Sequence, residues 1–271
     1  MNALLDPAAK LVIAHRGNSA FVPENTLESF QQAVELGADA LEFDVRLSRD
    51  GRAVVIHDAT LARTTNGAGA VGALTLGELQ RLDAGHCFTR DGGRTFPFRG
   101  RGISVPAFEL VLSAFPRMPM IVEIKTRAAS AEVKRLIERS GAAGRCLVGA
   151  FDDAAIAPFR GTAIAHSASR RELVRLFARA LRPGSPARVP YQALAIPPRT
   201  KGLPLPVMRM ARMARVAGAT THVWTIDDPA QARRYWAGAV NGIITNDPAA
   251  ILASAGRANT ARTTPSLSPV A

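Results

Sequence analysis

The chain has 271 residues, of which 47% are hydrophobic, and a formal net charge of +12 from 34 basic and 22 acidic residues. This length is close to that of a single (β/α)8 barrel, and the hydrophobic content suffices for a large buried core, which excludes an intrinsically disordered chain. Cys87 and Cys146 lie far apart in neither metal nor redox spacing, which argues against a disulfide framework and against a cysteine-ligated zinc site.

The excess of basic over acidic residues is concentrated in the second half of the chain. From Arg160 to Arg234, fourteen basic residues stand against three acidic ones. Within residues 170–181 the arginines recur at steps of four beside leucines, which is typical of the solvent-facing side of an outer helix. Neither interleaved aromatic residues nor zinc ligands accompany the charge, so we expect no nucleic-acid partner. A weak contact between this half and an anionic membrane surface is a second expectation.

The N-terminus and the apolar runs argue against export and against a membrane span. Residues 1–10 contain no basic region followed by an apolar stretch of signal length. No apolar run approaches the roughly eighteen residues that a membrane helix needs. We therefore expect a cytoplasmic protein.

In chain order, the first elements alternate between strand and helix. The apolar run at 11–14 predicts a strand, and the helical pattern at 26–38 follows it. Residues 40–45 predict a second strand, on which apolar and acidic residues alternate. After a turn, the apolar run at 53–57 extends this strand.

Residues 59–105 interrupt the regular pattern. They are irregular apart from one helical pattern at 75–85, and we predict that they form a cap or lid over the site, since long insertions are often functional. Order returns with a helix at 105–116, a third strand at 120–125 and a helix at 129–140.

The strand-helix unit then recurs five more times. Eight such units predict an α/β fold of the closed (β/α)8 TIM-barrel type, with a small insertion after the second strand. We expect one catalytic barrel domain over residues 1–254 that contains the insertion, and a disordered tail over 255–271, where apolar periodicity is lacking. The remaining predicted strands cover residues 145–151, 162–166, 191–196, 221–226 and 241–245.

Ionisable residues gather at the ends of the first three strands. Active sites of these barrels lie at the carboxyl ends of the strands, so we expect these side chains to converge on one rim. Glu42 and Asp44 share one face of the second strand, and such an acidic face is costly to bury unless a cation neutralises it. The seven candidates are His15, Arg16, Glu42, Asp44, His57, Glu123 and Lys125.

The residue types indicate a reaction. Three carboxylates without cysteine or paired-histidine ligand spacing favour a hard divalent ion, Mg²⁺ or Ca²⁺, over zinc. Arg16 and Lys125 are suited to holding a phosphate group. Of the two histidines, one can take a proton from a nucleophile while the other gives one to the leaving oxygen. Metal-assisted cleavage of a phosphate ester fits all seven residues.

Short motifs occur in order across the predicted barrel. They are HRG at 15–17, PENT at 23–26, EFDVRLSRDG at 42–51, VIHD at 55–58, EIK at 123–125, WTI at 224–226 and IITNDP at 243–248. Together they resemble the glycerophosphodiester phosphodiesterase family over roughly residues 11–253. The resemblance implies hydrolysis of glycerophosphodiesters to sn-glycerol 3-phosphate and an alcohol.

The resemblance also implies roles for individual residues. Glu42, Asp44 and Glu123 match the ligands of one divalent cation, and His15 and His57 match the acid-base pair. Which histidine is the base, and whether water or the glycerol 2-hydroxyl attacks, stay open at this point.

Further positions match substrate contacts of the family. Arg16 and Lys125 match the phosphate-contacting positions, and we expect Asn25 near the metal or the substrate. Trp224 matches an aromatic residue expected to pack against the glycerol or the leaving group. The chain departs from the family in having Asn246 where aspartate is common.

Two alternatives stay open. In the first, the same site acts as a lysophospholipase D on lysophospholipids, with Phe88, Phe96 and Phe98 of the insertion contacting lipid. In the second, suggested only by the net charge, the barrel binds phosphodiesters or nucleic acid without catalysis.

Overall fold

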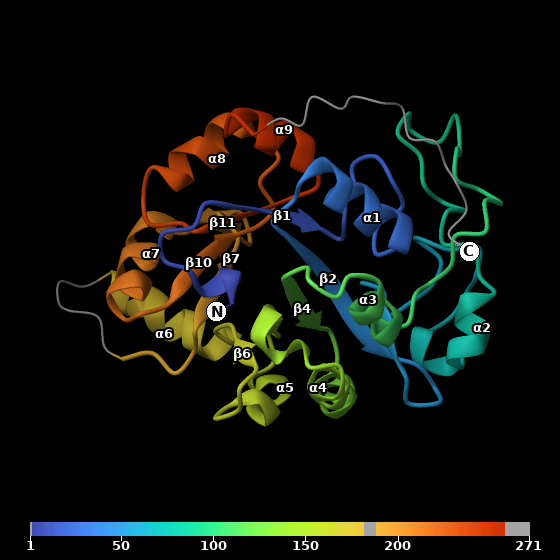
Figure 1. Cartoon of the computed structure of the whole chain (residues 1–271), viewed down its shortest axis with the longest axis horizontal. Helices are drawn as coiled ribbons and strands as arrows, with labels where there is room; N and C mark the ends of the chain where they lie inside the picture. The colour runs from blue at the N-terminus through green and yellow to red at the C-terminus, as the bar shows by residue number, and fades with distance from the viewer. Residues whose placement is uncertain (1, 182–187, 258–271) are drawn as a thin grey trace.

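Eight parallel strands form a ring that the helices surround (Figure 1). The computed structural model describes residues 2–181 and 188–257. The hydrogen-bonded order is β6-β5-β4-β2-β1-β11-β10-β7, and a bridge between Ser167 and Ala193 joins β6 to β7, which closes the ring. The predicted (β/α)8 barrel is therefore confirmed. The strands are β1 (Leu11–His15), β2 (Ala40–Leu47), β4 (Met120–Ile124), β5 (Cys146–Gly149), β6 (Ala165–His166), β7 (Ala193–Ile196), β10 (Thr220–Val223) and β11 (Gly242–Thr245).

The helices begin and end at residues that the sequence marks. Thr26 caps the first helix by accepting a hydrogen bond from the backbone N–H of Ser29, and Gly37 ends that helix at a φ of 93°. The helices are α1 (Leu27–Leu36), α2 (Leu76–Gln80), α3 (Phe108–Ala114), α4 (Ser130–Arg139), α5 (Asp153–Ile156), α6 (Arg170–Ala180), α7 (Val207–Val216), α8 (Pro229–Trp236) and α9 (Pro248–Ser254).

Alternation along β2 separates the apolar core from the site. Leu41, Phe43 and Val45 are fully buried in the apolar cluster that also contains residues of α1, α3 and α4. The intervening residues, Glu42 and Asp44, therefore face the barrel interior. The predicted acidic face is confirmed, and it is buried.

The insertion after the second strand folds around a small core of its own. It follows β3 (Ala53–Val55), which pairs with β2 in antiparallel orientation. Leu61, Val71, Leu79 and Ile103 form the centre of this core. The helix predicted at 75–85 is present but ends earlier, at Gln80, and a capping box between Thr75 and Glu78 starts it.

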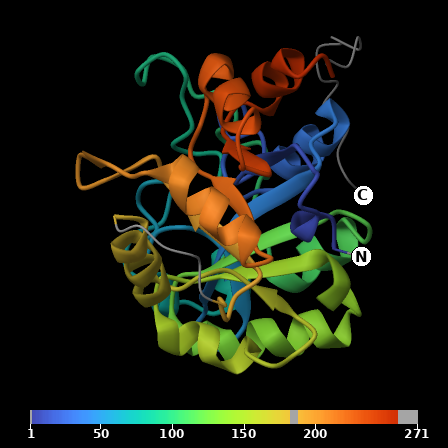
Figure 2. The same cartoon turned by 90° about the vertical axis from the view of Figure 1, so that its left-hand side faces the viewer.

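The hairpin after β7 and the short 3-10 helices were not predicted. The strands β8 (Arg199–Thr200) and β9 (Leu203–Pro204) form a hairpin after β7, and the 3-10 helix η1 (Ala3–Leu5) precedes β1. Figure 2 shows that the hairpin and the η1 helix lie on opposite sides of the molecule. Lys201 and Gly202 turn the hairpin, with φ values of 47° and 79°.

The η1 helix closes the end of the barrel that lies opposite the carboxyl ends of the strands. Leu4 is fully buried among the interior residues of the barrel. Its carbonyl oxygen accepts hydrogen bonds from Thr220 Oγ1 (2.9 Å) and from His222 Nε2 (3.0 Å). The imidazole of His222 is completely buried beside Gly242, where an added Cβ would lie 2.3 Å from His222 Nδ1. Burial lowers the pKa of His222 to about 4.

The predicted tail lies almost wholly outside the described residues, which end at 257. Arg257 still contacts the barrel, since its guanidinium group lies 2.6 Å and 2.8 Å from the two carboxylate oxygens of Asp39. The division into a domain of residues 1–254 and a tail thus stays a prediction. Over 2–181 and 188–257, no helix is both long and apolar enough to cross a membrane.

We predict that the free energy of unfolding falls as the pH is lowered from about 6.5 toward 4. In this range an unfolded histidine binds a proton that the folded state excludes from His222, so protonation favours unfolding. The loss at pH 4 is on the order of 3 kcal/mol, from a difference of roughly two pKa units. Urea unfolding at pH 7.5 and pH 4.5 measures it.

The matched variant is His222→Gln, whose amide can still donate to the Leu4 carbonyl but does not titrate. Its stability is expected to depend less on pH than that of the wild type. Equal pH dependence in both proteins would show that His222 is not responsible.

Candidate active site

One cavity of about 170 Å³ lies at the carboxyl ends of the strands. Its walls include six of the seven ionisable residues singled out in the sequence, and the seventh, Asp44, lies 2.9 Å from Lys125 Nζ. The structure therefore brings all seven together, from β1, β2, β4 and the short segments that follow β1, β3 and β4. The six lining residues are His15, Arg16, Glu42, His57, Glu123 and Lys125.

The turn that follows β1 places Arg16 over the second strand. Arg16 adopts a φ of 56° and Gly17 a φ of 87°. A Cβ at Gly17 would lie 2.2 Å from Ser29 Oγ, so only glycine allows α1 to pack this closely against the turn. The Arg16 backbone N–H donates to the Glu42 carbonyl (2.7 Å), and Ser29 Oγ donates to the Arg16 carbonyl (3.0 Å).

Glu42, Asp44 and Glu123 form a compact carboxylate cluster. Each offers an oxygen within 4.8 Å of the others, since Asp44 on β2 lies opposite Glu123 on β4. Burial, together with the charges of Asp44 and Glu123, raises the pKa of Glu42 well above its ordinary value. Glu42 Oε2 is buried and accepts no hydrogen bond from any described residue. These oxygen ligands and the unsatisfied Glu42 oxygen fit a divalent cation.

Three side chains stabilise Asp44 in its ionised form. Lys125 Nζ lies 2.9 Å from Asp44 Oδ1 and 2.7 Å from Glu123 Oε1, and Arg16 Nε lies 3.0 Å from Asp44 Oδ2. Although burial opposes ionisation, Lys125 and Arg16 hold the pKa of Asp44 below its ordinary value. The Asn25 amide donates to Asp44 Oδ2 (3.0 Å), so Asn25 contacts a carboxylate of the cluster.

His15 has a neutral hydrogen-bond partner on Nδ1. Asn246 Nδ2 donates to Asp227 Oδ2 (2.8 Å), which leaves Asn246 Oδ1 directed at His15 Nδ1, 2.6 Å away. Because this oxygen only accepts, His15 carries a proton on Nδ1, and in the neutral ring Nε2 is therefore the unprotonated nitrogen. His15 Nε2 lies 3.8 Å from Glu42 Oε2. Burial and the charge of Arg16 lower the pKa of His15.

His57 has a charged partner on the same ring nitrogen. Its Nδ1 lies 2.5 Å from Asp58 Oδ1. The hydrogen bond from Arg63 is the main reason why the pKa of Asp58 is lowered, so Asp58 is ionised. The Asp58 carboxylate therefore fixes the orientation of the His57 ring through Nδ1. The two histidines of the cavity therefore differ in the charge of their supporting residue.

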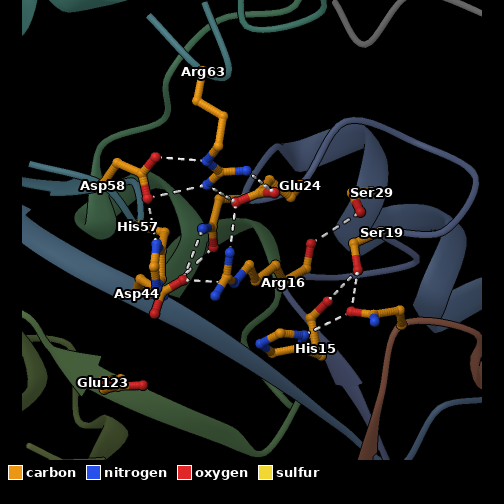
Figure 3. A network of polar contacts seen from close by, with 12 residues as sticks. His15, Arg16, Ser19, Glu24, Ser29, Asp44, His57, Asp58, Arg63 and Glu123 are labelled. Atoms are coloured by element: carbon orange, nitrogen blue, oxygen red, sulfur yellow. Dashed lines mark hydrogen bonds and ion pairs between the residues drawn. The ribbon is translucent and has the colours of Figure 1, made fainter. Parts of the chain in front are cut away.

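Sequence reasoning missed Arg63, which connects the insertion to the site (Figure 3). Its guanidinium group donates to both oxygens of Glu24 (2.7 Å and 2.8 Å) and to Asp58 (2.5 Å). Glu24 Oε1 also accepts from Arg16 Nη1 (2.8 Å). The sequence shows only an arginine six residues after His57. Its partner in the PENT motif, Glu24, lies 39 positions earlier, so the pairing could not be predicted.

An aromatic pair forms the apolar wall of the cavity. Trp224, expected from the sequence, and Phe151 both line the cavity, with ring centroids 6.2 Å apart and planes at 75°. This edge-to-face arrangement leaves an apolar surface for the carbon skeleton of a ligand.

The fold and the site define a (β/α)8 barrel whose catalytic rim combines a carboxylate cluster, two positively charged side chains and two histidines. The chain belongs to the glycerophosphoryl diester phosphodiesterase family, whose sequence model matches residues 15–250. The predicted family and enzyme class are confirmed.

Relatives cover nearly the whole chain. The chain is 32% identical over 255 residues to the glycerophosphodiester phosphodiesterase of Caldanaerobacter subterraneus subsp. tengcongensis, which covers 89% of this chain and 96% of that protein. The crystal structure of the glycerophosphodiester phosphodiesterase from Agrobacterium tumefaciens has a TM-score of 0.71 at 28% identity and covers 90% and 99% of the two chains. An Oleispira antarctica phosphodiesterase, solved with the product sn-glycerol-3-phosphate, shares the fold with a TM-score of 0.71 at 23% identity, covering 91% and 96%.

We predict that Arg63→Ala lowers kcat/KM by roughly 10- to 100-fold, because Asp58 and Glu24 lose the group that orients them. Hydrolysis of glycerophosphocholine measures the effect, and circular dichroism checks the fold. Arg101→Ala is the matched control, since Arg101 is an exposed arginine of the same insertion. An Arg63→Ala enzyme as active as this control would remove Arg63 from the positioning network.

Proposed function

We propose that this protein hydrolyses glycerophosphodiesters to sn-glycerol 3-phosphate and an alcohol, with one divalent cation. The observation that carries the proposal is a single cavity lined by carboxylates, by Arg16 and Lys125, and by two histidines with different supporting residues. Family membership supports the reaction class. The Oleispira antarctica phosphodiesterase, which shares this fold, was solved with the product that we propose.

Glu42, Asp44 and Glu123 would hold the cation. Their all-oxygen donor set favours Mg²⁺ or Ca²⁺. When bound, such an ion neutralises charge on a phosphate oxygen and so favours attack at phosphorus.

Arg16 and Lys125 bind the reacting phosphate in this proposal. Both line the cavity, and the carboxylates beside them raise the pKa of each above its ordinary value, despite burial. They are therefore fully charged at neutral pH. The ion pair between Arg16 Nη1 and Glu24 Oε1 orients the guanidinium group before substrate binds, so little reorganisation is needed in the transition state.

The supporting residues divide the proton transfers between the histidines. His15 presents an unprotonated Nε2 and takes the proton of the nucleophile, whether that is water or the glycerol 2-hydroxyl. His57, whose Nδ1 is held by the Asp58 carboxylate, gives a proton to the alcohol oxygen as its bond to phosphorus breaks. One proton is accepted and one is donated, so the net change on the enzyme is a transfer from His57 to His15.

The phenylalanines of the insertion favour a water-soluble substrate over a lysophospholipid. Phe88 and Phe98 pack edge to face with centroids 5.3 Å apart, and Arg99 covers the ring of Phe96 at 3.8 Å. These rings are thus engaged within the insertion itself. Contact with an anionic membrane surface stays a prediction.

We predict that Glu42→Gln lowers turnover of glycerophosphocholine by at least about 100-fold, because the cluster loses one of its three charged ligands. Release of sn-glycerol 3-phosphate in Mg²⁺, Ca²⁺ or EDTA measures it. Glu109→Gln, which changes a carboxylate on the outer helix α3, is the control. Full activity of the Glu42 variant, or of the wild type in EDTA, would contradict the proposed metal site.

The two histidines are expected to respond differently to the leaving group. A p-nitrophenyl ester of sn-glycerol 3-phosphate releases an anion that needs no protonation, so His57→Ala should lose much less activity on it than on glycerophosphocholine. His15→Ala should lose activity on both substrates, because the nucleophile still needs a base. If His15→Ala, and not His57→Ala, lost less activity on the p-nitrophenyl ester, the two roles would be exchanged. Equal losses of both variants on both substrates would exclude this division of proton transfer.

A further inference from the structure

A second, open groove adjoins the reaction cavity. It runs between the loop after β5 and the first turns of α6. Phe151 lines both spaces, and Leu173 of α6 lines the reaction cavity while Val174 lines the groove. A ligand bound in the reaction cavity can therefore continue past Phe151 into the groove.

The groove carries three arginines whose guanidinium groups form neither a hydrogen bond nor an ion pair within residues 2–181 and 188–257. Arg170, Arg171 and Arg175 are exposed, and their guanidinium groups form no hydrogen bond or ion pair with the residues that the structure describes. This distinguishes them from Arg16 and Lys125, whose charges are matched by carboxylates.

The two acidic residues of the groove are already engaged. Asp152 Oδ1 accepts from the Ala154 backbone N–H (3.0 Å) and caps α5. Asp153 Oδ1 accepts from Ser169 Oγ (2.9 Å) and from Arg160 (2.9 Å). Arg171 adds a favourable charge to Asp153, but no ion pair joins them within the described chain. The arginine forks thus remain available to an external anion.

We propose that this groove binds a second phosphate group of the substrate, so that the enzyme prefers glycerophosphodiesters whose alcohol carries a phosphate. The inference rests on the proposed function and specifies its substrate class. Guanidinium groups suit phosphate because their parallel N–H donors match its oxygens. The exposed Phe151 and Val174 supply apolar contact for the carbon chain between the two phosphates. A neutral alcohol gains no charged contact there, and a cationic alcohol meets three arginines against two aspartates.

The test compares kcat/KM for bis(glycerophospho)glycerol, glycerophosphoglycerol and glycerophosphocholine. The wild type is expected to prefer the first substrate by about tenfold or more at low salt. In the double variant Arg171→Ala/Arg175→Ala the ratio of the first two values is expected to fall toward one. The control double variant Arg212→Ala/Arg215→Ala removes the same charge from exposed positions of α7 and should keep the wild-type ratio.

The outcomes separate this proposal from the proposed function. Hydrolysis of all three substrates without preference, or a preference that survives in the double variant, overturns the groove and leaves the reaction intact. No hydrolysis of any of them overturns the reaction, and calorimetric binding of bis(glycerophospho)glycerol then decides on the groove: binding lost in the double variant supports it, and equal binding overturns it. Arginine-dependent sedimentation with phosphatidylglycerol vesicles, without preference among soluble substrates, would mark a lipid contact and also overturn it.

Discussion

Two buried carboxylates, with the half-buried Glu123 beside them, form the constraint on which the rest of the site depends. Removing ionised carboxylates from water without counter-charges costs on the order of several kcal/mol each. Asp44, which is 1% exposed, meets this cost through Lys125 and Arg16. Glu42 has no comparable partner, so its proton affinity is raised by burial and by its two acidic neighbours. A divalent cation bound by the three carboxylates would relieve this repulsion. The repulsion between the carboxylates therefore disfavours the cluster without a cation and favours cation binding.

The same charges attach the insertion to the barrel. Arg16 pairs with Asp44 on one side and with Glu24 on the other, and Glu24 pairs with Arg63 of the insertion. Arg63 in turn holds Asp58, the residue next to His57. Arg16, Glu24 and Arg63 each pair with two charged groups. A substitution at Arg63 therefore alters the environment of the buried carboxylates. The insertion is thus part of the electrostatic support of the site, and its role as a cap or lid stays a prediction.

Local sequence patterns predicted the barrel strands and the seven residues of the site, but they could not predict contacts between residues that are distant in the sequence. Alternation places Glu42 and Asp44 on one face whatever the rest of the chain does, and the rule that barrels gather strand ends was enough to assemble seven residues. Asp58 is adjacent to His57 in the sequence, whereas the residue that supports His15 is brought to it only by tertiary structure. Asn246 lies 231 positions from His15 and meets it only because β11 pairs with β1. The irregular path that carries Arg63 to Glu24 has no periodicity, and a 3-10 helix of three residues has too little pattern to be detected.

The η1 helix also bears on how the chain reaches this structure. The Leu4 carbonyl accepts hydrogen bonds from Thr220 and His222, which lie 216 and 218 positions later. The Asn2 amide donates to the Cys146 carbonyl, 144 positions later. During synthesis these first residues must wait for β10 before their native contacts can form, and β1 must wait for β11 before the ring can close. Such contacts raise the contact order, which slows folding and prolongs the exposure of unpaired strand edges. A barrel sealed by its own first residues therefore completes folding only when nearly all of its strands have been made.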